Sequence, residues 1–89
     1  MTDVTQAAQA GYRGDTEQRP AYLSSPNGLA YIAGMQHRLN GGQFPEKARM
    51  GRGCAVHVGS RLYQERDCQD ARLTIIGSMR AEAASREAH

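Results

Sequence analysis

The sequence has few of the residues that usually build a large core or a covalent framework. Its 89 residues include no tryptophan, one phenylalanine, one lysine and two cysteines, Cys54 and Cys68. Two cysteines are too few for a disulfide framework, and we expect both thiols to be reduced. No apolar run approaches the roughly 18 residues of a membrane span, and the first residues lack the basic and apolar regions of a signal peptide. These absences predict a cytoplasmic protein with no membrane partner.

The motifs of catalysis and of metal binding are also missing. The sequence contains no nucleophile elbow, no paired-carboxylate motif and no phosphate-binding loop, so we expect neither an enzyme nor a cofactor. Cys54 and His57 lie three positions apart, while His37, Cys68 and His89 are scattered singly. A structural zinc site normally shows two tight ligand pairs, so the spacing predicts no bound metal.

Two segments carry clear helical signals. Ser25 is a favourable N-cap before Pro26, and the sequence Asn40-Gly41-Gly42 is a strong helix stop, which predicts a helix over residues 26–39. A second helix is predicted over residues 67–87. Apolar residues recur every three or four positions in both segments and are expected to be buried together: Leu29, Ile32, Met35, Leu39, Cys68, Ala71, Ile75 and Met79.

The rest of the chain is less regular. Residues 1–24 are polar, with at most a short helical turn over 6–10, and predict a partly ordered, mobile N-terminal arm. Residues 54–64 fit either a strand or a helix, and helix is favoured because a lone strand has nothing obvious to pair with. The expected fold is therefore mostly α: a small helical domain of two to three helices over residues 25–89, with Gly-rich connectors.

Charge is unevenly distributed. The net charge is +2 and ten of the eleven basic residues are arginine. Residues 38–66 contain six basic and two acidic residues, a local charge of +4 that leaves −2 for the remainder. A concentrated basic zone is typical of a polyanion binder, and His37 and His57 can add to it. A GC-rich genome produces the same arginine bias without functional meaning, and a solvated connector carries charges that never converge.

One stretch resembles a known family. The sequence Ala30-Tyr31-Ile32-Ala33-Gly34-Met35, followed by Arg38, Gly41-Gly42 and Pro45, is similar to the helix and loop of the ribosome modulation factor family. The likeness spans residues 28–63, although Glu46 replaces the family's aromatic residue and the usual tryptophan is absent. The resemblance implies a small helical protein that binds ribosomal RNA.

The leading hypothesis is thus a non-enzymatic regulatory protein whose partner is RNA or the ribosome. The expected RNA-facing residues, with Tyr63 as a further stacking candidate, are Tyr31, Arg38, Lys47, Arg49, Arg52 and Arg61. The main alternative is a phage-encoded inhibitor that binds a host protein or a defence complex. A third reading is a small subunit that completes its core at an interface, which leaves a homo-oligomer open.

Overall fold

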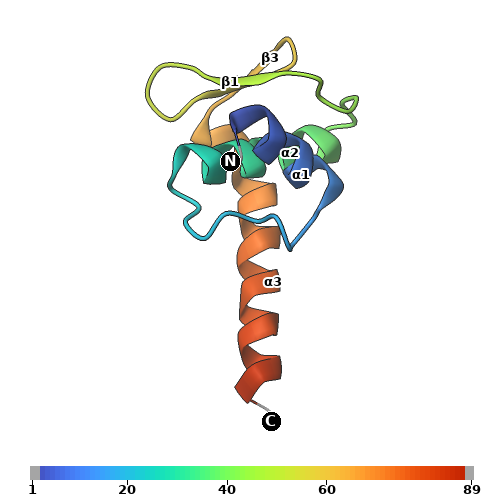
Figure 1. Cartoon of the computed structure of the whole chain (residues 1–89), viewed down its shortest axis with the longest axis vertical. Helices are drawn as coiled ribbons and strands as arrows, with labels where there is room; N and C mark the ends of the chain where they lie inside the picture. The colour runs from blue at the N-terminus through green and yellow to red at the C-terminus, as the bar shows by residue number, and fades with distance from the viewer. Residues whose placement is uncertain (1–2, 88–89) are drawn as a thin grey trace.

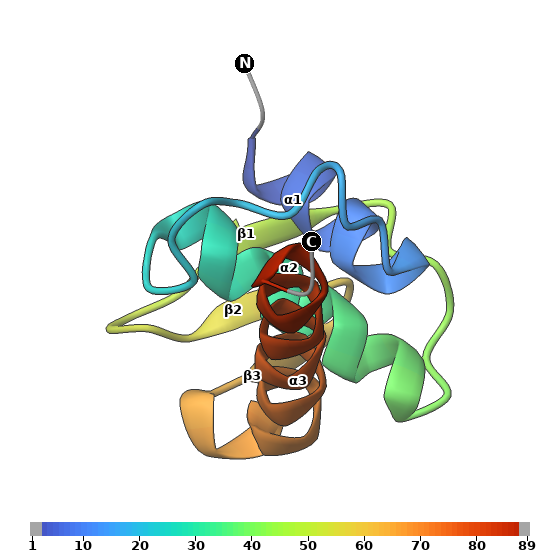
Figure 2. The same ribbon diagram turned by 90° about the horizontal axis from the view of Figure 1, so that it is seen from below.

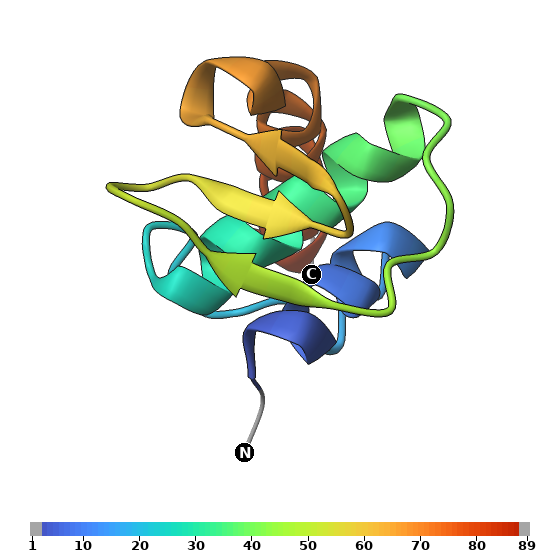
Figure 3. The same cartoon turned by 90° about the horizontal axis from the view of Figure 1, so that it is seen from above.

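The computed structural model describes residues 3–87 of the chain. Three α-helices, a three-stranded sheet and one 3-10 helix follow one another in the order α1 (Val4–Arg13), α2 (Pro26–Leu39), β1 (Ala48–Met50), β2 (Val56–Val58), β3 (Arg61–Tyr63), η1 (Glu65–Cys68) and α3 (Gln69–Glu87). The strands are antiparallel in the order β1-β2-β3. The sheet lies across α1 and α2, and α3 extends away on the other side (Figures 1 and 3).

Helix α2 confirms the first predicted helix at both ends. The Ser25 hydroxyl accepts a hydrogen bond from the Gly28 N–H at 3.0 Å, and Pro26 occupies the first helical position. At the other end Gly41 adopts a φ of 79°, a conformation that side chains rarely adopt, so the stop signal acts as predicted. Ile32 is fully buried, but Leu39 is exposed because it lies in the last turn, beyond the cover of its neighbours.

In the predicted N-terminal arm, residues 4–13 form α1, a longer helix than the short turn expected over residues 6–10. Asp3 and Gln6 make a reciprocal capping box at its start. Its inner face consists of small residues that pack into the same core as α2: Ala7, Ala8, Ala10 and Gly11. Each of these side chains has little apolar area. The sequence of α1 therefore has a polar character, although one face of the helix is completely buried.

The two helices approach so closely that their backbones are in contact. A Cβ atom on Gly11 would overlap the carbonyl oxygen of Tyr31, and one on Gly34 would overlap the carbonyl oxygen of Ala8. Glycine at both positions allows this approach. Alanine and glycine therefore substitute here for the large apolar residues that the sequence lacks.

The helical interpretation of residues 54–64 is also wrong, because β2 and β3 form a hairpin. Their two-residue turn is Gly59-Ser60, and Gly59 has a φ of 63°, as the first position of a type II′ turn requires. Strand β1 supplies the pairing partner that the sequence did not reveal. Val56, Val58 and Tyr63 are buried beneath the sheet.

Helix α3 confirms the second predicted helix, preceded by η1. Ala71 and Ile75 are buried as expected, but Met79 is 38% exposed, so its predicted burial is wrong. The reason is geometric, because the distal half of α3 passes beyond α2 and projects from the molecule (Figures 1 and 2). The buried Gln36 side chain joins the two helices by accepting a hydrogen bond from the Ala71 N–H at 3.0 Å.

Among residues 3–87, no helix combines the length and the apolar character that crossing a bilayer requires.

Candidate nucleic-acid interface

Four aromatic rings gather where α1 and α2 end. We call Tyr12, His37, Phe44 and Tyr63 the aromatic cluster. Tyr12 meets Phe44 edge to face at 5.5 Å between ring centroids, and His37 meets Tyr63 in the same manner at 5.7 Å. The His37 Nδ1 atom lies 2.7 Å from the Tyr63 hydroxyl, and the Tyr12 hydroxyl donates to the Gly42 carbonyl at 2.8 Å. These contacts hold the rings in fixed positions.

Three arginines make cation–π contacts with rings of this cluster. The guanidinium of Arg13 lies 4.8 Å from the centre of the Phe44 ring. Those of Arg38 and Arg61 lie 5.7 Å and 5.3 Å from the rings of Tyr12 and Tyr63. Stacking on a ring restrains a guanidinium and leaves donors at its edge for another ligand. Cations from α1, α2 and β3 are thereby brought to one end of the molecule.

Two cavities open beside the cluster, and together we call them the groove. The larger has a volume of about 640 Å³ and is lined in part by Gln43, Phe44 and Ser60. The smaller, of about 450 Å³, is lined in part by Arg49 and His57. They adjoin because both are lined by Lys47 and Gly59. The groove therefore has aromatic side chains in the larger cavity and Arg49 in the smaller one, with Lys47 lining both.

The strand register explains why Arg49 and His57 face outward. Arg49, His57 and Leu62 are direct neighbours across the three strands, in the alternate positions to buried Val56 and Val58. Side chains alternate between the two faces of a strand, so this row lies on the uncovered face. The outer edge of β1 is closed by Thr5, whose hydroxyl donates to the Ala48 carbonyl at 3.0 Å.

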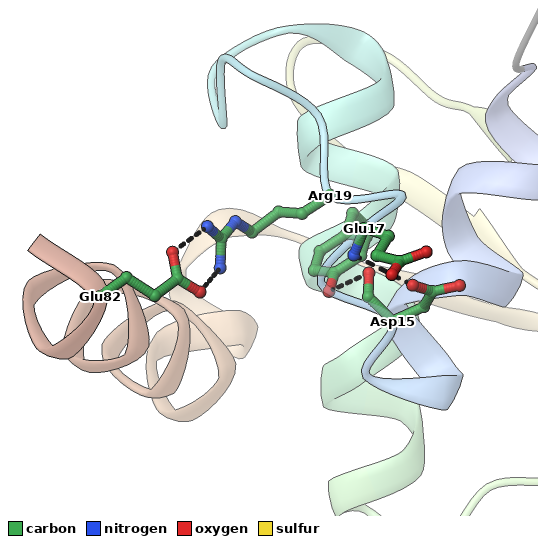
Figure 4. Close-up of polar contacts among 5 residues, drawn as sticks. Asp15, Glu17, Arg19 and Glu82 are labelled. Carbon is green, nitrogen blue, oxygen red and sulfur yellow. Dashed lines mark hydrogen bonds and ion pairs between the residues drawn. The ribbon is translucent and has the colours of Figure 1, made fainter. Parts of the chain in front are cut away.

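The cations around the groove are not neutralised by ion pairs. Within the described part of the chain, the ion pairs are Arg19 with Glu82 at 2.8 Å and Arg72 with Glu65 at 3.6 Å. Both involve α3, and Figure 4 shows Arg19 reaching it from the loop after α1. Glu46 is the one carboxylate among the residues lining the larger cavity. The groove therefore presents a surplus of positive charge.

Four of the six predicted interface residues lie at this end of the molecule. Lys47 and Arg49 line the groove, while Arg38 and Arg61 rest on the aromatic cluster. Arg52 is exposed in the β1–β2 connection, at the other end of β2 from the Gly59 turn, and is separate from them.

Tyr31 and Tyr63 are not stacking surfaces, and that prediction is wrong. Tyr31 is only 1% exposed, and its hydroxyl donates to the Asp15 carbonyl at 3.0 Å. Burial raises the pKa of the Tyr31 hydroxyl, and it raises that of Tyr63 for the same reason. The Tyr31 ring adjoins the loop after α1 and the first half of α3, and Tyr63 contacts His37 of α2, so neither ring is open to a base.

Sequence reasoning missed Arg13 and Phe44. Arg13 comes next to Phe44 at the end of α1, a helix that the polar composition of the segment concealed. Phe44 gave one signal: the only phenylalanine of the chain stands in a polar connector between Gly-Gly-Gln and Pro45. It is 41% exposed and lines the larger cavity.

The two cysteines lie apart from the groove, and neither is in a disulfide. Cys54 is exposed and Cys68 is buried, where loss of solvent raises the pKa of its thiol to about 11. Over residues 3–87, no three His, Cys, Asp or Glu side chains gather as a metal site would require. His89, one of the scattered candidate ligands, lies outside the described residues.

Comparisons with protein-family models, with curated proteins and with solved structures each gave no match. The resemblance to ribosome modulation factors is thus carried by the sequence motif alone.

Proposed function

We propose that the protein is a non-enzymatic regulatory binding protein whose partner is RNA, free or within the ribosome. The single observation that carries this proposal is that cations outside the ion pairs of residues 3–87 lie in the groove and on the adjoining aromatic cluster. Lys47 and Arg49 line it, and Arg13, Arg38 and Arg61 surround the adjoining aromatic cluster. The phosphate backbone is the ligand that such a surface favours, because charge-assisted contacts to phosphate supply most of the affinity for nucleic acid.

The geometry adds to the charge argument. A guanidinium held against a ring loses less conformational freedom when it binds, so its hydrogen bonds to phosphate contribute more net free energy. Arg13 stacks on Phe44, which lines the groove, and Arg38 and Arg61 stack on other rings of the same cluster, whereas α3 carries charges of both signs. This unequal distribution of charge favours a binding site at one end of the molecule over weak attraction spread across its whole surface.

The test compares two pairs of charge reversals that change the net charge equally. Lys47→Glu with Arg49→Glu alters the groove, while Arg80→Glu with Arg86→Glu alters exposed positions on α3. Affinity for a single-stranded RNA is measured against salt, where the log–log slope is about −0.7 per phosphate neutralised. The groove pair should flatten the slope by about 1.4, equivalent to two phosphates, and release the protein from ribosomal fractions.

The α3 pair should keep the wild-type slope. Equal losses in both pairs would show attraction by net charge alone and would contradict a specific interface. No affinity for RNA in wild-type protein, even at low salt, would refute the proposal.

A second candidate function is an inhibitor that binds a host protein or defence complex. It is favoured by the exposed apolar side chains far from the groove, above all Tyr22 and Leu73. An interface with an apolar core depends weakly on salt. This candidate therefore predicts a salt-resistant complex with one protein, weakened by Leu73→Ala and unaffected by the groove pair.

A further inference from the structure

Two rings of the aromatic cluster, His37 and Phe44, line the larger cavity, and Phe44 is the more exposed of the two. Tyr63 is buried and Tyr12 is half-buried, whereas Phe44 is 41% exposed and lines the larger cavity. The Tyr12 ring meets Phe44 edge to face, and the Arg13 guanidinium lies over the Phe44 ring, so both contacts restrain it. Phe44 therefore presents an accessible ring at the wall of a hollow that is otherwise lined largely by polar groups.

The groups around Phe44 match the parts of a nucleotide. The ring offers a stacking surface to the face of a base, and Gln43 and Ser60 in the same cavity offer hydrogen bonds to its edge. Lys47 stands at the junction of the two cavities, and Arg49 and His57 follow in the second one. A base site and a cation site therefore adjoin, as a base and its flanking phosphates do along a strand.

An accessible aromatic ring distinguishes single-stranded from double-stranded nucleic acid. In a duplex the base faces are covered by neighbouring pairs and only the edges are accessible, whereas an unpaired base exposes its face. We therefore propose that the groove takes single-stranded RNA, with one unstacked base against Phe44 and the adjoining phosphates at Lys47 and Arg49. This inference rests on the proposed function and narrows it to one strand form.

The absence of tryptophan gives a direct experiment. The variant Phe44→Trp places the only indole of the chain at the proposed base site. An unstructured RNA of about ten nucleotides should quench its fluorescence, while the same sequence as a perfect duplex should not. Leu73→Trp, at an exposed position on α3, is the matched control and should not respond to either RNA.

Removing the ring should weaken binding without changing its electrostatics. Phe44→Leu is expected to reduce affinity for the single strand about 5- to 100-fold, the range for loss of one base stack. The salt slope should stay unchanged, because no phosphate contact is lost, and Phe44→Tyr should retain the affinity. The melting temperature of each variant, checked by circular dichroism, shows whether the fold is kept.

The outcomes separate this inference from the proposed function. Duplex bound as tightly as single strand, or a Phe44→Leu variant with unchanged affinity, would overturn the strand inference and leave RNA binding in place. A mononucleotide that quenches Phe44→Trp as strongly as the strand would also overturn it, by showing a small-molecule pocket. Absence of any RNA binding by the wild-type protein would refute the proposed function itself.

Discussion

Helices α2 and α3 were predicted from the same kind of apolar spacing, yet they have different surroundings. Seven of the 14 residues of α2 are buried, whereas α3 buries two of its 19, Ala71 and Ile75. Helix α2 packs against both α1 and the sheet, while the distal half of α3 projects from the molecule (Figure 1). Apolar spacing therefore shows which face of a helix can be buried, and the partner determines how much of it is.

The partners of the two helices explain the contrast. The small residues of α1 let its backbone touch that of α2, so even Gly34 is buried. Beyond Ser78, a fork of hydrogen bonds from Arg19 to Glu82 joins α3 to the loop after α1, with N–O distances of 2.8 and 3.4 Å. We therefore expect substitutions on the two helices to have opposite or very unequal effects on the stability of the protein.

The largest difference is expected between two identical substitutions. Gly34→Ala would force a Cβ atom into the Ala8 carbonyl, so the helices must separate, at a cost of about 3 kcal/mol or more. Gly77→Ala on α3 meets nothing within 4 Å and should instead stabilise the helix by up to about 1 kcal/mol. Thermal unfolding followed by circular dichroism measures both changes. A Gly34→Ala protein with the wild-type melting temperature would contradict the close packing of α1 and α2.

A second comparison lies within α3 itself. Ile75 is 2% exposed and packs against the core, so Ile75→Ala should lower the free energy of unfolding by about 2–5 kcal/mol. Leu73, which is 66% exposed, should change it by less than about 0.5 kcal/mol when replaced by Ala. Urea denaturation measures the difference. Similar losses for both variants would show that the outer face of α3 is covered in solution.

The smallest effect concerns pH and the distal half of α3. The hydrogen bond from Arg19 holds the pKa of the Glu82 carboxyl below its ordinary value. The pair therefore stabilises the protein fully above the ordinary pKa of a glutamate, and this contribution disappears as pH falls through the lowered value. Glu82→Gln should lower the melting temperature slightly at neutral pH and have less effect in acid. Glu87→Gln removes the same charge and is the control. Its melting temperature should not show this difference from wild type that shrinks in acid.

Much of the helical part of this fold could be predicted from the sequence, because its signals are local. Ser25 and Pro26 mark the start of α2, and Gly41 marks its end. Helix α1 could not, since small residues become a core only when another helix approaches them closely. The sheet was hidden for a similar reason, because Gly59-Ser60 predicts a hairpin only once a third strand is known to complete it.

The cations of the proposed interface could be predicted from the sequence, but its accessible aromatic ring could not. The basic segment predicted Lys47 and Arg49 as interface residues, and both line the groove. Tyr31 was misassigned because spacing alone does not distinguish a core aromatic from an exposed one. The accessible ring, Phe44, joins the site through contacts with Tyr12 and Arg13 on α1, the element that the sequence concealed.

The most direct test of the interface is an NMR titration of the protein with a short single-stranded RNA at low salt. Backbone amide shifts should concentrate around the groove, at Phe44, Lys47, Arg49, His57 and Gly59, while the exposed half of α3 should stay unchanged. Raising the salt concentration should reverse the shifts, since phosphate contacts release counterions. Shifts confined to α3, or none at any RNA concentration, would contradict the assignment of the groove as the binding site.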